Sequence, residues 1–590
     1  MLDSRSRTSA SWYRAALVCA TLLLATGVGA AQAQTPAPQP GPPIPLIPQA
    51  SVLAQASPSV PPPPGPPGTA LPGSVVAAPL AALNPDELGA LPDGVPALPK
   101  TLWDGTERPV VDALLGQLQP TTSPALQDLA FRLLASPATA PAGNVPPGAL
   151  AAVRAEQLSG FGHPDAALQL VRTLPPPQLV GDAAQVLVEL LFLTEDSDHA
   201  CAEVKSRDPS WQGVFWDQAA VTCNLLGGQT APAQIGLDML SEEGGASSGF
   251  SALVSRAAGF DVPMPQELPP PQPLSLALLA KAGKGLPPSI LTNGSLAVLR
   301  AVALAPQLPE EARLIAAEKA AAFGAVSPDQ LAAAYLALPL DPDEQNQPMN
   351  AALHENGVRA RAILFDAAHD ATDPGGRAQY LAVFFQKASG AGIYPAAIRA
   401  AQSMLLAIPP APDLGADAID MARALYALDL PDAARAWFDL LPPGGQQQFL
   451  PLAAIVGGAK APGWGNAVLL AANPATGDPD EAAIGRAGFA CQLLAALGRP
   501  APNSAILPLL AAGGAVTWEM PAAGPPALLA TAAAQHQVGG TILGILASLG
   551  SPGAAAPAPL VIASVAALHQ LGMDNEARHL AIDAAIAAGL

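Results

Sequence analysis

Cys201 and Cys223 are the residues whose type and spacing most directly suggest chemistry, the oxidation of two thiols to a disulfide. Cys201 lies early in one expected helix and Cys223 late in the next, so antiparallel packing would bring their Cα atoms close together. Such a bridge would close a loop of about 20 residues and stabilise the fold by roughly 3 kcal/mol. The alternative is two separate thiols packed in the core as small apolar side chains. Cys491, in the segment AGFACQLLAAL, is expected to be a core residue of that kind.

Other patterns that resemble catalytic or metal sites have simpler structural interpretations. None of the seven histidines lies at zinc-ligand spacing from a Cys, a carboxylate or another His, and His199 fits an exposed helix start. Residues 245–249 match the nucleophile elbow G-x-S-x-G, but that motif follows a strand, whereas a helix is expected here. The pair Glu310 and Glu311 lies at an expected helix start, where carboxylates complement the helix dipole. The sequence therefore predicts no catalytic residue, no metal ligand and no cofactor site.

Trp211, Phe215 and Trp216 are clustered aromatic residues in a chain with only 4% aromatic residues. Large rings gathered at one place could line a groove that binds a peptide. The same rings could instead anchor two helices against each other in the core.

The cysteines Cys201 and Cys223 and the three aromatic residues all lie between Val186 and Glu243, where the helical pattern is clearest. Apolar residues recur there at helical spacing in three blocks, and polar residues or Gly and Pro separate the blocks. Three short helices are therefore expected. The composition agrees, because the apolar excess is mostly Ala and Leu, which favour helix over strand. The 68 prolines and 53 glycines argue against long uninterrupted helices.

A recurring register indicates that short helices pair along much of the chain. A Leu is followed nine positions later by an Ala and four positions after that by another apolar residue. The register occurs at Leu158/Ala167/Val171, Leu191/Ala200/Val204, Leu425/Ala434/Phe438 and Leu568/Ala577/Ala581. A Leu near the end of one helix, a turn, and a small Ala in the next helix would allow close packing of a helical hairpin.

This register resembles that of tetratricopeptide repeats. Leu158 and Leu191 lie 33 residues apart, near the 34-residue repeat, and Ala434 with Phe438 matches the A-x₃-F of the second repeat helix. The resemblance implies an all-α fold, a right-handed α-solenoid of helical hairpins. Its last helix, residues 575–588, would cap the array with a polar face.

The first 33 residues are organised like a secretory signal peptide. Arginines up to Arg14 precede an apolar run, and Ala31-Gln32-Ala33 forms a small-x-small cleavage site. Cleavage after Ala33 would give a periplasmic or secreted protein. The alternative is a segment retained as an N-terminal anchor.

Composition divides the remaining chain into two parts. Residues 34–99 are rich in Pro and nearly free of charge, which predicts a disordered, semi-stiff leader. Residues 100–590 form the expected helical repeat domain, which the Pro-rich segment 266–272 could divide in two. Signal, leader and Ala-rich helices together resemble secreted alphaproteobacterial Ala/Pro-rich proteins labelled antifreeze glycopeptide-like.

The charge and the apolar pattern limit the classes of partner. A formal charge of −20 argues against nucleic acid, because an acidic surface repels phosphate. The charge-free region between Glu519 and Asp574 suggests a membrane hairpin, but Gly and Pro interrupt its apolar runs well short of a span. No integral membrane span is therefore expected after signal cleavage.

These observations predict an exported cell-envelope scaffold or adaptor, which binds a protein or peptide through the surface of a helical repeat and has no catalytic activity. The alternative is a cell-wall (peptidoglycan) enzyme, or an accessory subunit of one, with a superhelical α-domain. Such an enzyme would need a catalytic carboxylate in a polar cleft.

Overall fold

The computed structural model describes residues 84–143, 146–175, 179, 181–208, 212–266, 273–283, 285–355, 357–457, 481–500 and 524–590. The chain divides into two units, Met1–Leu80 and Ala81–Leu590, and every described residue belongs to the second. The expected signal peptide, residues 34–83 of the expected leader, Trp211 and segment 267–272 lie outside the described residues. Every regular element in the described part is a helix, which confirms the all-α prediction.

The helices are short, and Pro begins many of them, because its missing N–H and fixed φ suit the first helical position. The first half contains η1 (Pro85–Glu87), α1 (Arg108–Leu115), α2 (Pro124–Ala135), α3 (Ala149–Gly160), α4 (Pro164–Val171), α5 (Asp182–Leu193), α6 (Ser197–Ser206), α7 (Val214–Leu226), α8 (Thr230–Glu242), α9 (Ser248–Ala257), α10 (Pro273–Ala282), α11 (Pro288–Asn293) and α12 (Leu296–Leu304).

The second half continues with α13 (Glu310–Ala322), α14 (Pro328–Leu336), α15 (Pro342–Asn346), α16 (Pro348–His354), α17 (Gly357–Asp370), α18 (Pro374–Gly390), α19 (Tyr394–Ala400), α20 (Gln402–Leu406), η3 (Pro412–Leu414), α21 (Ala418–Ala427), α22 (Pro431–Phe438), α23 (Pro443–Gly457), α25 (Glu481–Ala496), α27 (Gly524–Ala534), α28 (Val538–Leu549), η5 (Gly553–Ala555), α29 (Ala558–Gln570) and α30 (Asp574–Ala587). In the described part, no helix is long and apolar enough to cross a membrane.

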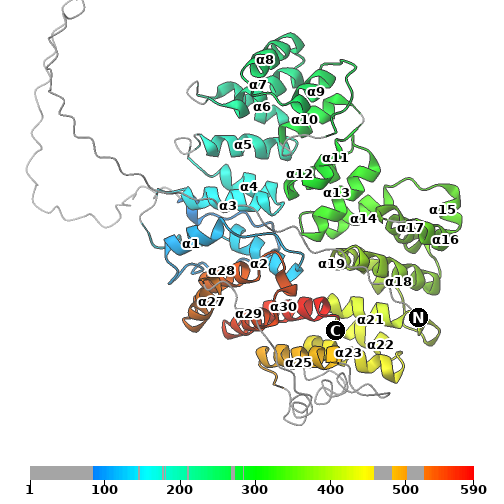
Figure 1. Ribbon diagram of the computed structural model, residues 1–590. Helices are drawn as coiled ribbons and strands as arrows, with labels where there is room; N and C mark the ends of the chain where they lie inside the picture. The colour runs from blue at the N-terminus through cyan, green and yellow to red at the C-terminus, as the bar shows by residue number, and fades with distance from the viewer. Residues whose placement is uncertain are drawn as a thin grey trace, which may run out of the picture. The chain divides into compact units, whose positions relative to one another are not determined.

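Successive helices pack in pairs (Figure 1), among them α3 with α4, α5 with α6, α7 with α8, α12 with α13, α17 with α18, α21 with α22, α27 with α28 and α29 with α30. At all four positions of the Leu and Ala register, both residues are buried. The turn between α3 and α4 requires Gly162, which has a φ of +83° and lies so close to Ala325 that a side chain would collide with it.

Helices from the two ends of this unit are also in contact. The helix α2 packs against α28 and α30, and α1 packs against α28 (Figure 1). The carbonyl oxygen of Leu102 accepts a hydrogen bond of 2.8 Å from the backbone N–H of Gly539. In an open solenoid each repeat contacts only its neighbours. The prediction that this final helix caps the array with a polar face is therefore wrong, because α30 contacts α2, α21 and α23.

The packed part of the chain begins before residue 100, the expected start of the helical domain. Arg154 is buried on α3, and its guanidinium donates hydrogen bonds to the carbonyl oxygens of Asp86, Leu88, Leu134 and Ser136 at 2.6–3.2 Å. Burial lowers the pKa of Arg154 to about 10. These bonds attach residues 86–88 to α2 and α3, so the prediction of a disordered leader is wrong for this segment.

A second buried polar cluster joins α13, α14 and α17. Glu318 accepts hydrogen bonds from Arg361 Nε at 2.7 Å, from Arg361 Nη2 at 2.5 Å and from the Tyr335 hydroxyl at 2.8 Å. Burial, followed by the charge of Glu318, raises the pKa of Tyr335. All members of the cluster are paired, as buried ionic groups require.

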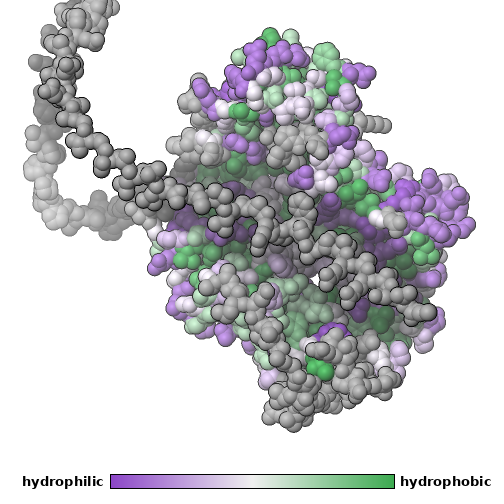
Figure 2. Space-filling model, in the orientation of Figure 1, coloured by the Kyte–Doolittle hydropathy of each residue, from purple (hydrophilic) through white to green (hydrophobic). Residues whose placement is uncertain are grey.

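The polar segment 341–350 contains the short helix α15 and the start of α16. Asp341 and Glu344 form a capping box at the start of α15, and Arg359 binds Glu344 at 2.7 Å. The surface over these helices is largely hydrophilic (Figure 2). This segment therefore extends the helical array instead of interrupting it.

Cys201 and Cys223 form the expected disulfide, which joins α6 to α7 with the two Cα atoms 5.4 Å apart. Cys491 is a buried free thiol, and burial raises its pKa to about 11.

Trp216 is buried on α7, and the half-buried ring of Phe215 packs edge-on against it with the centroids 5.2 Å apart. The position of Trp216 fits the interpretation that these aromatic rings anchor helices.

Candidate functional site

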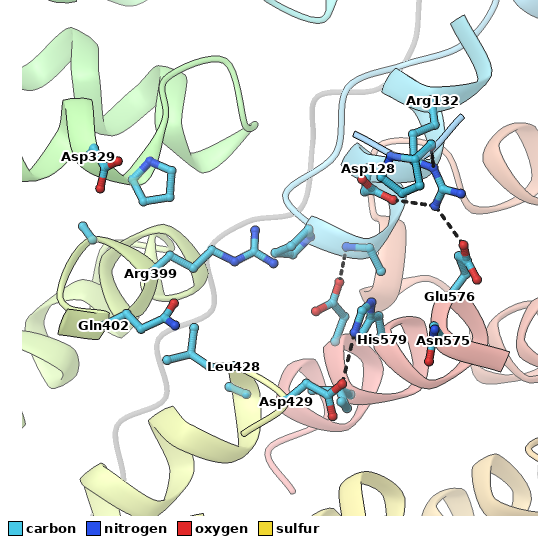
Figure 3. Close-up of a pocket in the computed structure, with 18 of the residues that line it drawn as sticks. Asp128, Arg132, Asp329, Arg399, Gln402, Leu428, Asp429, Asn575, Glu576 and His579 are labelled. Atoms are coloured by element: carbon cyan, nitrogen blue, oxygen red, sulfur yellow. Dashed lines mark hydrogen bonds and ion pairs between the residues drawn. The ribbon is translucent and has the colours of Figure 1, made fainter. Parts of the chain in front are cut away.

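A cavity of about 950 Å³ lies where helices from four regions of the sequence meet. Its walls include the ends of α2, α14, α19 to α21 and α30 (Figure 3). Two neighbouring cavities, of about 470 and 200 Å³, share Pro124 and Arg399 with it. Arg399 therefore lies at the junction of the three spaces, which we call the central cavity.

Arg132 forms the first polar connection across the wall of the central cavity. Its Nη1 atom lies 3.0 Å from Asp128 on the same helix and 2.8 Å from Glu576 on α30. Its Nε donates a 3.0 Å hydrogen bond to the carbonyl oxygen of Pro96. Burial lowers the pKa of Arg132, but the two carboxylates outweigh burial and the net direction is upward.

Asp583 forms the second connection, from α30 to the first turn of α2. Its carboxylate accepts hydrogen bonds from Ser123 Oγ at 2.6 Å and from the backbone N–H of Ala125 at 2.9 Å. The side chain of Ser123, the residue preceding α2, makes no capping hydrogen bond to that helix. Asp583 thus supplies the carboxylate that a helix N-terminus favours. Burial raises its pKa, against the opposing effect of these hydrogen bonds.

Asp429 forms the third connection, in the turn between α21 and α22. Its φ of +56° places it in the left-handed region, which Asp tolerates better than most residues. Its carboxylate binds Arg578 Nη2 at 2.8 Å and His579 Nε2 at 3.1 Å, both on α30. The three connections hold α30 between the start of the unit and its middle.

Arg399 differs from Arg132, the other arginine of the wall, because its guanidinium has no partner among the described residues. It forms neither a hydrogen bond nor an ion pair with any residue that the structure describes, and it extends from α19 into the central cavity (Figure 3). Its side chain reaches solvent, but the surrounding walls restrict hydration and lower its pKa, which Asp583 and Asp128 partly counteract. The guanidinium of Arg399 is thus positioned in the cavity and available to bind an anionic group of a ligand.

Carboxylates predominate elsewhere in the cavity of about 950 Å³, which we call the main cavity. Five acidic residues and two arginines line it, together with polar residues such as Gln402, Ser403 and Asn575. The side chains of four of the acids make hydrogen bonds or ion pairs with other residues of the protein. The side chain of the exposed Asp329, at the start of α14, makes neither within the described part. The negative surplus favours ligands that carry positive charge.

The residues singled out from the sequence lie elsewhere. Ser247, the serine of the G-x-S-x-G match, caps α9 by accepting a 3.2 Å hydrogen bond from the Phe250 N–H. Glu310 and Glu311 occupy the first turn of α13, the position that was expected for them. His199 is exposed and contacts Asp196. Across the described helices and turns, no three His, Cys, Asp or Glu side chains are grouped to hold a metal ion.

Sequence reasoning missed the central cavity because its residues carry no local signal. Arg399 is the single charged residue of α19, and a single charged residue on a short helix predicts only that this side of the helix faces solvent. Its neighbours Asp128 and Asp583 lie far away in the sequence. Only the contact of α2 with α30 brings them together.

Comparison with known proteins adds no relative, since no protein-family model, curated protein sequence or solved structure matches the chain.

Proposed function

We propose that this chain is an exported cell-envelope scaffold or adaptor that binds a protein or peptide partner in the central cavity, without catalysing a reaction. The observation that carries this proposal is the guanidinium of Arg399, which reaches solvent in the cavity and has no partner among the described residues, whereas Arg132, Asp128, Asp429, Glu576 and Asp583 all have protein partners. A charged group held without a partner loses hydration and regains a counter-charge only when a ligand supplies one.

The repeat architecture supports the same proposal. Successive hairpins with a buried Leu and Ala register are consistent with a tetratricopeptide-like, right-handed α-solenoid, to which the contact of α2 with α30 adds a closure. Solenoids of this kind present concave surfaces to their partners. Closure would turn such a surface into a cavity that admits a segment of a partner.

The engagement of the carboxylates favours binding over catalysis. Asp128 and Glu576 neutralise Arg132, Asp583 caps α2, and Asp429 holds α30. A general acid or base must be free to exchange a proton with substrate. These groups instead have structural partners.

Site-specific photo-crosslinking in cells tests the proposal. A photoreactive residue at Ser403, exposed in the cavity wall, should yield adducts with a defined partner or peptide, identified by mass spectrometry. The matched control is the same residue at Glu242, exposed at the end of α8. Equal adducts at both positions, or none at Ser403, would contradict binding in the cavity.

N-terminal sequencing of the mature protein, with Gln34 as the expected first residue, tests export.

A cell-wall enzyme or its accessory subunit is the second candidate, and Asp583 is the observation that favours it. Its carboxyl lines the cavity, and burial raises its pKa, as a general acid requires. In this case, a zymogram on purified peptidoglycan would show clearing by the wild type and no clearing by Asp583→Asn. No clearing by the wild type or by any envelope complex containing it would exclude this candidate.

A further inference from the structure

The charges of the central cavity define the kind of ligand that would fit it, provided that the proposed binding function holds. Arg399 offers one positive point at the junction of the three spaces. Of the five carboxylates that line the main cavity, two bind Arg132 and one, Asp429, binds Arg578, which leaves those of Asp329 and Asp583 without an ion pair among the described residues. The cavity therefore combines one free cation with a negative surplus.

Ligands with a single sign of charge do not satisfy this arrangement. A phosphate or other multivalent anion would pair with Arg399 but meet repulsion from the surrounding carboxylates. A purely cationic ligand would be attracted by the surplus but repelled by Arg399 at the junction of the three spaces. A ligand with one carboxylate and one separate positive group satisfies both parts of the wall.

We propose that the central cavity binds a short zwitterionic peptide segment, with a peptide carboxylate on Arg399 and a peptide ammonium or basic side chain against the acidic wall that includes Asp329. The carboxylate is either the C-terminus of the peptide or an Asp or Glu side chain. A guanidinium matches either source through two parallel hydrogen bonds.

The remaining lining suits a peptide between these two charged ends. Gln402, Ser403 and Asn575 bring amide and hydroxyl groups, which match the N–H and C=O groups of an extended backbone. Leu406, which is 50% exposed, and Leu428 add apolar surface for side chains. A volume of about 950 Å³ lies within the range of natural ligand sites and leaves room for several residues.

Equilibrium dialysis of the purified full chain against a tryptic digest of casein tests this inference, with retained peptides quantified by mass spectrometry. Tryptic peptides carry an α-carboxylate, an α-amine and, nearly always, a C-terminal Lys or Arg. Three chemically modified samples of the digest separate the ligand groups: one with all carboxyls amidated, one with only the C-termini amidated, and one with all amines acetylated.

The wild type should retain a subset of peptides, and Arg399→Gln should bind them about tenfold or more weakly, because a hydrogen bond to a charged group is lost. Arg399→Lys should restore part of the affinity. Asp329→Asn should weaken binding about threefold, as expected for an exposed ion pair. The side chains of Arg399 and Asp329 make no hydrogen bond to a described residue, so both variants should keep the wild-type circular dichroism and unfolding midpoint.

The outcomes distinguish the proposed recognition of a zwitterionic peptide from peptide binding in general. Loss of retention on amidation of the C-termini assigns the α-carboxylate, whereas loss only when all carboxyls are amidated assigns a side chain. Equal retention by wild type and Arg399→Gln would overturn the inference and leave peptide binding standing. Equal retention of the acetylated peptides that end in Lys and contain no Arg or His would refute the role of the positive group, because acetylation removes every positive charge from these peptides but leaves the guanidinium of Arg-ending peptides. No retained peptide with wild type would overturn both the inference and peptide binding in the cavity.

Discussion

Acidification is expected to destabilise the fold through His163, in the turn between α3 and α4. The imidazole is largely buried, and its ring centroid lies 4.4 Å from that of Phe131 on α2. Burial, followed by the positive charge of Arg300, lowers its pKa from 6.5 to about 4, against the weaker opposing effect of Asp165. The folded protein therefore holds His163 neutral under conditions in which an unfolded chain would protonate it.

The direction and size of the effect follow from proton linkage. Between pH 6.5 and pH 4 the unfolded state binds the extra proton, so the stability contributed by neutral His163 is complete above pH 6.5 and is lost as the pH falls. The pKa difference, at 1.36 kcal/mol per pH unit, corresponds to an upper limit of about 3 kcal/mol. This is a large part of the ~5–15 kcal/mol that typically stabilises a folded protein.

Two measurements check the effect. Urea unfolding between pH 7.5 and pH 4.5 should show that His163→Phe and His163→Gln both lose less stability on acidification than the wild type does. Agreement between two unlike replacements separates titration from packing. Histidine ring NMR signals should include one, absent from both variants, that stays neutral down to about pH 5. A His163 signal that titrates near pH 6.5, or parallel pH slopes for all three proteins, would refute the reasoning.

Three further perturbations test individual contacts. Reduction of the bridge between Cys201 and Cys223 should lower the free energy of unfolding by roughly 3 kcal/mol, measured by urea denaturation with and without reductant. Arg361→Leu should cost about 3–5 kcal/mol because it leaves a buried carboxylate unpaired, whereas Arg435→Leu, in an exposed pair, should cost less than about 1 kcal/mol. Asp583→Ala should cost about 1 kcal/mol and reduce the hydrogen-exchange protection of the first turn of α2; unchanged protection would contradict its capping role.

The helices and their pairing were predictable because their signals are local. Pro at the first helical position, Gly162 in a turn and a Leu followed by an Ala are all read within one hairpin. The disulfide was predictable for the same reason, since α6 and α7 are consecutive helices. Contacts between residues that lie close together in the sequence can be predicted from local sequence patterns.

The closure and the cavity were not predictable, because no local pattern encodes them. Asp583 lies in the helix that was expected to cap the array with a polar face, and nothing near it in the sequence indicates that it would cap α2. Similarly, the Pro-rich composition before residue 100 masks the few apolar residues, such as Ala90 and Leu98, that are buried in the core. In both cases the partner lies far along the chain.

Closure of α30 onto α2 also has a consequence for biogenesis. Asp583 and Glu576 lie in α30, so the cavity wall is incomplete until this helix has emerged from the ribosome. A nascent or prematurely terminated chain would present the start of α2 uncapped and Arg132 without one of its two carboxylates. Only chains that include α30 can assemble the proposed binding site, so truncation before α30 should abolish binding of the partner.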